Sequence, residues 1–158
     1  MTTLVTGGAG FIGSHTVRLL ASQGRDVVVL DSLELGDRSR IPGIPFVEAD
    51  IADERAIEKA CRKYGINDVI HFAAYKAVGE SMEQPLRYYN NNVAGSIALV
   101  HALLANGVER IVFSSSAAVY GNPDHVPVNE DAPLKPESVY AETKVHVERF
   151  LKIGRAHV

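Results

Sequence analysis

A tyrosine and a lysine near the end of the chain have the spacing of a pair that could transfer a proton. Tyr140 and Lys144 lie four residues apart in a stretch with helical periodicity, so their side chains share one helix face. An ammonium group close to a phenol stabilises the phenolate, which can then act as a general base near neutral pH. Three serines at 114–116 follow an apolar run, and a serine hydroxyl there could hydrogen-bond the same substrate oxygen. These residue types predict proton transfer to and from a substrate alcohol.

Three glycines near the N-terminus predict a phosphate-binding turn. They come after a short apolar run and before an amphipathic segment, which is the order strand, turn, helix. Gly7 permits the turn, Gly10 lets the backbone approach a pyrophosphate, and Gly13 lets helix and strand pack closely. The phosphates would lie at the helix N-terminus, where N–H groups and the helix dipole favour negative charge.

An aspartate after the second apolar run completes the pattern of a dinucleotide site. The run at 27–30 ends in Asp31, about 20 residues after the glycines, where a carboxylate would bind the hydroxyls of an adenosine ribose. Each feature alone has a simpler explanation: a glycine-rich turn, a solvent-facing aspartate, a serine that caps a helix, or a chance Tyr-x-x-x-Lys. Their occurrence together favours an enzyme that removes a proton from an alcohol while hydride passes to a nicotinamide cofactor.

The composition is that of an ordinary α/β protein. The chain has 158 residues, 46% hydrophobic and 22% charged, which suits one domain with a core. A net charge of −3 gives no reason to expect nucleic acid or an anionic membrane as a partner, and no apolar run approaches the roughly 20 residues that span a bilayer. The first strand begins at the N-terminus and leaves no room for a signal peptide, so we expect a cytoplasmic protein. Cys61 is the single cysteine, which excludes an intrachain disulfide, and the six histidines show no metal-ligand spacing, so we expect no metal.

Strand and helix patterns alternate along the whole chain. Such alternation, with nearly continuous apolar strands, predicts a parallel sheet that helices cover on both faces. We expect a doubly wound α/β fold of the Rossmann type, with strand order 3-2-1-4-5 and ligands at the carboxyl ends of the strands. Residues 121–136 contain four prolines and are expected to form a loop. The expected strands lie at 4–5, 27–31, 46–50, 68–74 and 110–114, and the later helices at 53–64, 86–106 and 138–152.

Three longer stretches resemble the UDP-glucose 4-epimerase family, a branch of the extended short-chain dehydrogenases/reductases (NAD-dependent epimerases and dehydratases) that act on sugar nucleotides. The stretches are residues 71–81, 88–93 and 113–121, and the piece Lys-Ala-Val-Gly-Glu-Ser within the first is the most discriminating. Sugar-nucleotide dehydratases typically carry Asp-Glu where this chain has Ala117 and Ala118, which favours an epimerase. The resemblance extends from residue 2 to about residue 152.

The resemblance implies interconversion of UDP-galactose and UDP-glucose, a step of galactose metabolism, through a transient 4-keto sugar. Tyr140 would take the proton of the sugar 4-hydroxyl while hydride passes from C4 to bound NAD. Ser116 would orient the oxygen, and Lys144 would hold the nicotinamide ribose and tune Tyr140. Lys76, Ser116 and Tyr140 would contact the UDP-sugar substrate, and the full-length protein would be a homodimer.

The resemblance also implies NAD contacts from the glycine turn, the strand ends and the loops that follow them. The loop at 34–38 departs from the asparagine-rich loop usual in the family, and Val139 and Ala141 replace the usual Pro and Gly around the tyrosine. None of these changes touches the residues that carry the chemistry. The implied NAD contacts are Gly7, Gly10, Phe11, Ile12, Gly13, Asp31, Ser32, Leu33, Asp50, Ile51, Phe72, Ala73, Ala74, Lys76, Asn92, Ser114, Tyr140 and Lys144.

The end of the sequence does not fit the pattern before it. Residues 153–158, Ile-Gly-Arg-Ala-His-Val, break the helical periodicity and match an in-frame reading of a common sequencing adapter. Members of the family continue for a comparable length, with the last sheet strands and the UDP-sugar domain. We therefore expect residues 1–152 to be the NAD-binding domain of a chain truncated before its last strands and substrate domain, and residues 153–158 to be an artefactual tail. A genuine short protein with a frayed end is the alternative.

Two other functions stay open. One is another NAD-dependent nucleotide-sugar epimerase or a decarboxylase, because the half of the protein that contacts the sugar would be missing. The other is a non-catalytic NAD-sensing module, although a sensor would not need to keep Ser116, Tyr140 and Lys144 together. The present chain alone is expected to have no epimerase activity.

Overall fold

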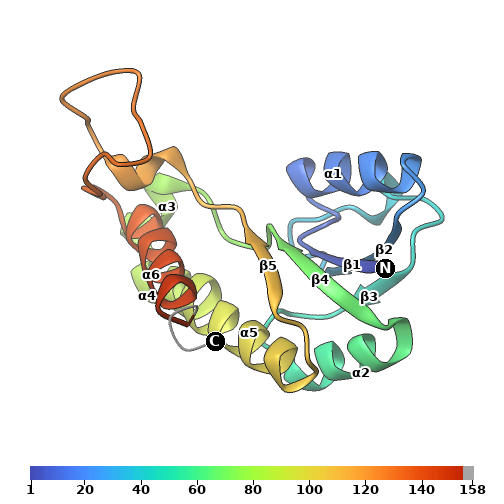
Figure 1. The fold of residues 1–158 in the computed structure, drawn as a ribbon. Coiled ribbons are helices and arrows are strands. Elements are labelled where there is room, and N and C mark those ends of the chain that lie inside the picture. The colour runs from blue at the N-terminus through green and yellow to red at the C-terminus, as the bar shows by residue number, and fades with distance from the viewer. Residues whose placement is uncertain (155–158) are drawn as a thin grey trace. The chain divides into compact units, whose positions relative to one another are not determined.

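A parallel five-stranded sheet is the frame of the first of two compact units. The computed structural model describes residues 1–154. The sheet unit comprises residues 1–74 and 95–114, and the helical unit comprises residues 75–94 and the described residues from 115 onward. The strands pair in the order β3-β2-β1-β4-β5 and are all parallel, which confirms the predicted sheet (Figure 1). The elements of this unit are β1 (Thr2–Thr6), α1 (Phe11–Ser22), β2 (Asp26–Asp31), η1 (Arg38–Arg40), β3 (Phe46–Glu48), α2 (Glu54–Tyr64), β4 (Ile66–His71), α5 (Ser96–Ala105) and β5 (Arg110–Phe113).

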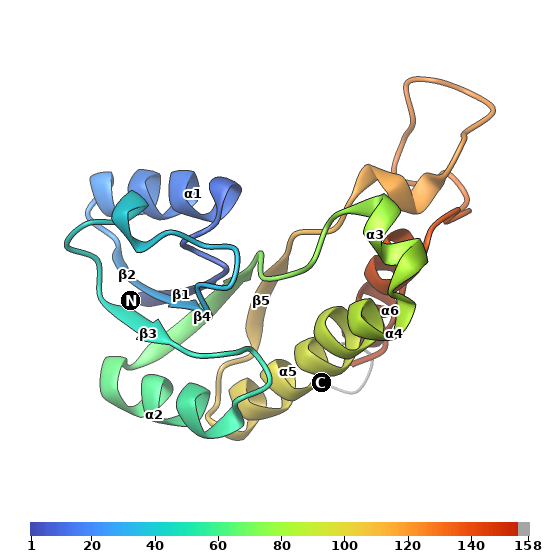
Figure 2. The ribbon, with the colours of Figure 1, turned by 180° about the vertical axis from the view of Figure 1, so that it is seen from behind.

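Helices cover both faces of the sheet, as the continuous apolar strands predicted. Figures 1 and 2 show α1 over one face and α2 and α5 over the other. Neighbouring residues of a strand point to opposite faces. Leu4 therefore belongs to one cluster with Ile57 of α2 and Leu99 of α5, whereas Val5 belongs to another with Val17 of α1. All five side chains are fully buried, so each strand contributes to two layers of core.

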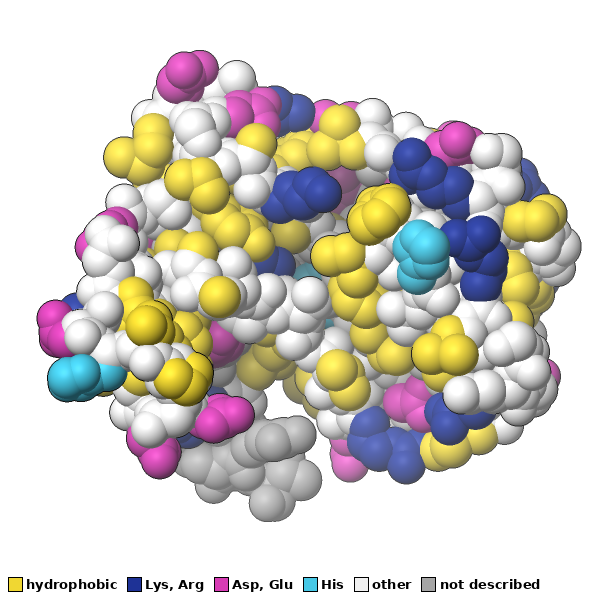
Figure 3. Space-filling model, turned by 90° about the horizontal axis from the view of Figure 1, so that it is seen from above, with side chains coloured by type: hydrophobic (Ala, Val, Ile, Leu, Met, Phe, Trp, Pro, Cys, Tyr) yellow, Lys and Arg dark blue, Asp and Glu magenta, His cyan; other side chains and the backbone are white. Residues whose placement is uncertain are grey.

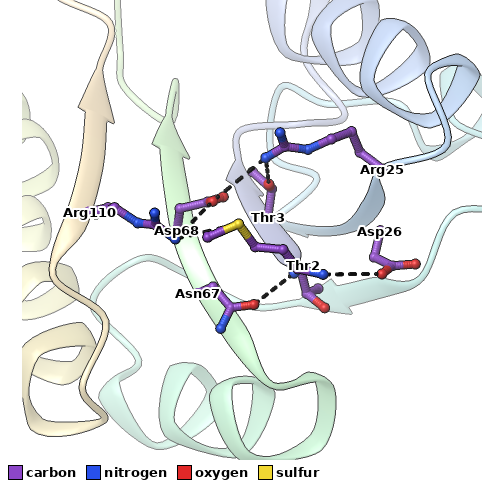
Figure 4. Close-up of polar contacts among 8 residues, drawn as sticks. Thr2, Thr3, Arg25, Asp26, Asn67, Asp68 and Arg110 are labelled. Carbon is purple, nitrogen blue, oxygen red and sulfur yellow. Dashed lines mark hydrogen bonds and ion pairs between the residues drawn. The ribbon is translucent and has the colours of Figure 1, made fainter.

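Polar contacts join the strands near their amino ends (Figure 4). Asp68 of β4 forms ion pairs with Arg25, which precedes β2, and with Arg110 of β5, each at 3.7 Å. Arg25 also donates a hydrogen bond to Thr3 Oγ1 of β1 at 3.2 Å. These contacts lie at the opposite ends of the strands from the carboxyl ends, where ligands bind in folds of this kind.

The helical unit contains short helices and one long helix. Residues 121–136 contain no helix or strand, as their four prolines predicted. The long helix α6 continues to Gly154, two residues beyond its expected end, and helix ends are the least sharply defined part of an element. The rest of the predicted artefactual tail, residues 155–158, lies outside the described residues. The elements here are α3 (Val78–Glu83), α4 (Pro85–Tyr88), η3 (Ala117–Tyr120) and α6 (Val139–Gly154).

The single helix predicted at 86–106 is divided into three parts. The short helix α4 is followed by the π-helical segment η2 (Tyr89–Gly95) and then by α5. π-helical turns are rare and often occur at functional sites. We attribute this one to Asn92, whose buried side chain hydrogen-bonds Tyr75 and Thr143, both of which lie outside this segment. A uniform helical period in the sequence does not reveal such a turn.

The surface mixes charged and hydrophobic side chains, and the single cysteine is buried. Charged side chains of both signs are interspersed with hydrophobic ones on the face shown in Figure 3. None of the helices within residues 1–154 is long and apolar enough to cross a membrane. Cys61 packs into the core beside α5, and its burial raises the pKa of the thiol, which favours the unreactive protonated form.

Candidate active site

The turn between β1 and α1 requires its glycines. Gly7 has φ +68°, a backbone conformation that L side chains rarely adopt. A Cβ atom at Gly13 would lie 2.2 Å from the carbonyl oxygen of Gly7, so only glycine lets α1 begin this close to the turn. Gly10 precedes α1 and has no side chain to cap it, and the first turn of α1 carries no acidic residue. The N-terminal amides of α1 could therefore bind an anionic phosphate, and phosphate binding at this turn stays a prediction.

Asp31 at the end of β2 fixes the loops at the carboxyl edge of the sheet. Its two carboxylate oxygens accept the backbone N–H groups of Ala9 and Leu33, both at 2.9 Å, and only 8% of Asp31 is exposed. Each oxygen has further lone-pair capacity, so the carboxylate could still accept ribose hydroxyls. The sequence did not indicate that Arg40 donates to the carbonyl oxygen of Ala9 at 3.2 Å. An arginine therefore reaches the same glycine turn.

The other predicted cofactor residues of the sheet unit follow the ends of β3 and β4. Residues 72–74 come directly after β4, and a Cβ atom at Gly7 would lie 2.6 Å from the backbone nitrogen of Ala73, so this segment borders the glycine turn. Asp50 is exposed beyond β3, whereas Ile51 is 4% exposed and packs in the core, so Ile51 could face a ligand only through its backbone. Three further predicted contacts are exposed: Phe11, Ile12 and Ser32.

His71 is a packed residue at the end of β4. It is 1% exposed, its Nδ1 lies 2.6 Å from Thr6 Oγ1, and its Nε2 lies 2.9 Å from Ser96 Oγ. These contacts connect the end of β1, the end of β4 and the start of α5. Within the described part of the chain, no group of three or more His, Cys, Asp or Glu residues is placed to hold a metal ion.

Tyr140 and Lys144 share a face of α6, as their spacing predicted. The Lys144 Nζ lies 5.9 Å from the centre of the Tyr140 ring. Lys144 is only 4% exposed, and burial lowers its pKa to about 8, although the nearby carboxylate of Glu148 acts in the opposite direction. The ammonium form still predominates at pH 7, so it can stabilise a phenolate on Tyr140.

The three serines after β5 have three different surroundings. Ser114 continues the pairing of β5 with β4 through its backbone N–H. Ser115 donates a hydrogen bond to the carboxylate of Glu148 on α6. Ser116 Oγ accepts the N–H of Ala118 at 3.2 Å and caps η3. A hydroxyl that accepts one hydrogen bond can still donate to a substrate oxygen, so a capping role and a chemical role are compatible at Ser116.

The piece Lys-Ala-Val-Gly-Glu-Ser contributes a polar network that the sequence did not reveal. Glu80 of α3 accepts a hydrogen bond from Arg87 at 2.5 Å and one from the Tyr88 hydroxyl at 2.8 Å. Tyr88 is fully buried, and burial together with Glu80 raises the pKa of Tyr88 to about 12. Arg87 also stacks over the ring of Tyr75, 4.3 Å from its centre. Tyr88 therefore packs the helical unit. The one signal of this network in the sequence was the pair of opposite charges seven residues apart, Glu80 and Arg87.

Lys76 and Asn92, both predicted to contact NAD, have contrasting surroundings. Lys76 is exposed in the loop between β4 and α3, where its ammonium is accessible to a phosphate. Asn92 is 2% exposed, and its side-chain amide hydrogen-bonds the backbone of Tyr75 and the hydroxyl of Thr143. The Asn92 side chain thus serves the protein itself, and a contact between either residue and NAD stays a prediction.

Comparison with known proteins identifies close relatives over nearly the whole chain. The NAD dependent epimerase/dehydratase family matches residues 3–157. The UDP-glucose 4-epimerase of Halalkalibacterium halodurans is 46% identical over 150 residues, which cover 95% of this chain and 45% of that protein. The chain thus spans about half the length of the curated relatives it matches.

Solved structures of similar proteins have the same fold. A UDP-glucose 4-epimerase from Stenotrophomonas maltophila with bound NAD and formylated UDP-arabinopyranose has a TM-score of 0.97 and 45% sequence identity, covering 99% of this chain and 49% of that one. A UDP-glucose 4-epimerase from Brucella ovis in complex with NAD has a TM-score of 0.95 and 43% identity, covering 98% of this chain and 48% of that one.

Proposed function

Because the chain belongs to the NAD dependent epimerase/dehydratase family, we propose that it is the cofactor-binding half of a UDP-glucose 4-epimerase. The observation that carries this proposal is the buried Lys144 beside Tyr140, in a chain that also has the glycine turn and Asp31. The complete protein would interconvert UDP-glucose and UDP-galactose, would serve galactose metabolism in the cytoplasm, and would be a homodimer.

The residues present fit NAD. The glycine turn puts no Cβ between the backbone and a pyrophosphate, and the N-terminal amides of α1 would hold the phosphates. Asp31 would hold the adenosine ribose, and Lys144 would hold the nicotinamide ribose. When bound, NAD would take up the hydride from C4 of the sugar and later return it.

Tyr140 would move the proton of the reaction. Its phenolate would accept the proton of the sugar 4-hydroxyl. It would return this proton to the 4-keto oxygen after the 4-keto sugar has rotated to present its other face. The Lys144 ammonium would stabilise the phenolate between these two steps, and the Ser116 hydroxyl would donate to the same sugar oxygen. Ala117 and Ala118 offer no acid to assist loss of water, which supports epimerisation over dehydration.

Two alternatives bear on the same residues. Another nucleotide sugar remains a candidate substrate, because the proton chemistry of Tyr140 does not depend on which sugar carries the hydroxyl. A non-catalytic NAD-sensing module is disfavoured because NAD binding alone requires no phenol such as that of Tyr140 beside the buried ammonium of Lys144.

A hybrid chain tests the proposal. In it, residues 1–152 are followed by the C-terminal half of the Halalkalibacterium halodurans UDP-glucose 4-epimerase, which is 46% identical to this chain where they align. The hybrid should convert UDP-galactose to UDP-glucose. Tyr140→Phe keeps the ring but removes the proton acceptor, so turnover should fall by about 10²–10⁴ while NAD stays bound. The matched variant Tyr64→Phe on α2 should keep normal turnover.

Two results would count against the proposal. Near-normal turnover in Tyr140→Phe would mean that another group accepts the proton. A hybrid that folds and binds NAD but converts no UDP-sugar would favour the sensing module.

A further inference from the structure

The backbone N–H of Tyr140 is held by a buried serine from another helix. Tyr140 is the second residue of α6, so its N–H has no carbonyl partner within that helix. Ser81 Oγ of α3 accepts this N–H at 3.1 Å and itself donates to the carbonyl oxygen of Val78 at 2.6 Å. Ser81 is fully buried, so water does not compete for these hydrogen bonds. Ser81 therefore anchors the first turn of α6 through the backbone of Tyr140.

The backbone carbonyl of Tyr140 accepts a hydrogen bond from one buried side chain, which a second buried side chain supports. Thr143 Oγ1 donates to this carbonyl oxygen at 2.6 Å, and Asn92 Nδ2 donates to Thr143 Oγ1 at 3.1 Å. Asn92 also pairs with the backbone of Tyr75, accepting its N–H at 2.9 Å and donating to its carbonyl oxygen at 3.0 Å. Thr143 is fully buried and Asn92 is 2% exposed. The carbonyl of Tyr140 is thereby linked to residue 75 through two side chains.

Capping of α6 alone does not explain this arrangement. Ser138 already caps the helix, because its hydroxyl accepts the N–H of Ala141 at 3.2 Å. Ser81 and Thr143 instead each hydrogen-bond one of the two peptide groups that flank Tyr140, and Asn92 supports Thr143. Fixing both peptide groups fixes the Cα–Cβ direction of Tyr140, and only the side-chain torsions then remain to place the phenol beside Lys144.

We propose that Ser81, Asn92 and Thr143 form a clamp that holds the backbone of Tyr140 and so positions its phenol for proton transfer. These three are positioning residues, because they act through Tyr140 and not on the substrate. The inference rests on the proposed function of Tyr140. A reacting group displaced by about 1 Å can lose up to roughly 10² in rate, so such a clamp has a measurable effect on turnover.

The first test measures amide hydrogen exchange by NMR in the 158-residue chain. The Tyr140 N–H should be protected in the parent chain, although amides in the first turn of a helix otherwise exchange quickly. Ser81→Ala should accelerate exchange at Tyr140 by about tenfold or more. Ser96→Ala is the matched control, because Ser96 is also a buried serine, 1% exposed, and its hydroxyl lies 2.9 Å from His71 Nε2. Exchange at Tyr140 should not change in Ser96→Ala, and equal exchange in the parent and in Ser81→Ala would overturn the clamp.

The second test measures turnover in the hybrid chain. Thr143→Val removes the hydroxyl but keeps the side-chain shape, so kcat should fall roughly ten- to a hundredfold while KM stays unchanged. Thr143→Ser restores the hydroxyl and should restore kcat, and Ser96→Ala should keep the parent kcat. An unchanged kcat in Thr143→Val, or an equal loss in Ser96→Ala, would overturn the positioning role. A hybrid without any turnover would count against the proposed function alone, because the exchange measurement tests the clamp without activity.

Discussion

Among the described residues, Lys144 is the one lysine or arginine that is buried, and it lies beside the tyrosine that would carry the proton. Burial disfavours its charged form, and Glu148 offsets only part of that penalty. Groups perturbed by desolvation and by a specific partner concentrate at functional sites. The cost of burying Lys144 should therefore be measurable as a pH-dependent contribution to stability.

We predict that this contribution makes the folded chain more stable as the pH rises above about 8. The pKa of Lys144 is about 8 in the folded chain and returns toward 10.5 on unfolding, so between these values the unfolded chain binds more protons. Below about pH 8 the full free-energy penalty of burying the Lys144 ammonium is present, and above about pH 10.5 it is gone. The free energy of unfolding of Lys144→Met should therefore be roughly 2–3 kcal/mol higher than that of the parent chain at pH 7. This difference should shrink toward pH 10.5.

Urea unfolding of both chains at a series of pH values measures this difference. Lys59→Met on α2 replaces an exposed lysine and should show no such pH-dependent difference from the parent. A gap between Lys144→Met and the parent that stays constant from pH 7 to 10.5 would show that burial of the ammonium carries no such penalty.

Asp31 predicts a preference for NAD over NADP. Its carboxylate would face the 2′-phosphate of NADP, which combines repulsion between like charges with the loss of a ribose hydrogen bond. Affinity for NAD should be at least about tenfold higher, which corresponds to about 1.4 kcal/mol. Arg40 reaches the same turn and is positively charged, so a preference for NAD would have to come from the Asp31 carboxylate. The ratio of the two cofactor affinities should therefore fall in Asp31→Asn. Calorimetric titration of both cofactors checks this, and equal or tighter binding of NADP would refute the role of Asp31.

At the scale of elements, the strands and the glycine turn could be predicted because their signals are local. A run such as 27–30 is apolar at every position because Val28 and Val29 face different core clusters on the two sides of the sheet. The glycine spacing follows from contacts within the turn itself, such as the one between Gly13 and Gly7. These signals need no knowledge of distant parts of the chain.

The π-helical segment and the polar networks of the helical unit could not be predicted in this way. Tyr75, Asn92 and Thr143 are separated by 17 and 51 residues, and only the fold brings them together. The resemblance pointed to the segment around Glu80 but not to its partners Arg87 and Tyr88. Hydrogen bonds between distant segments leave no period in the sequence.

The glycine turn gives a prediction at this scale. Gly13→Ala should lower the free energy of unfolding by about 3 kcal/mol or more and abolish NAD binding, because its Cβ would lie 2.2 Å from the Gly7 carbonyl oxygen. Gly79→Ala is the matched control, since a Cβ there meets nothing within 4 Å, and its stability should stay within about 1 kcal/mol of the parent. Urea unfolding and calorimetric NAD titration check both variants. Equal stability of the two would show that the turn tolerates a side chain.

At the scale of the whole molecule, the chain carries the candidate cofactor and proton-transfer residues but spans about half the length of its relatives. Binding energy from the remote UDP group is what would position a sugar for reaction. We predict that neither residues 1–152 nor the 158-residue chain converts UDP-galactose to UDP-glucose, and that both bind NAD equally well. A coupled assay for UDP-glucose checks this, and conversion by either chain would show that no further half is needed.

The most direct test of the proposed chemistry follows a deuterium label at C4 of UDP-galactose in the hybrid chain. Tyr140 exchanges only the hydroxyl proton with the sugar, and hydride returns to the carbon that it left, so the label should remain at C4 of the UDP-glucose product. NMR or mass spectrometry of the product measures the retention. Conversion with retained deuterium is the predicted result. Conversion with loss of the label to water, or no conversion by a folded hybrid with bound NAD, would contradict the assignment.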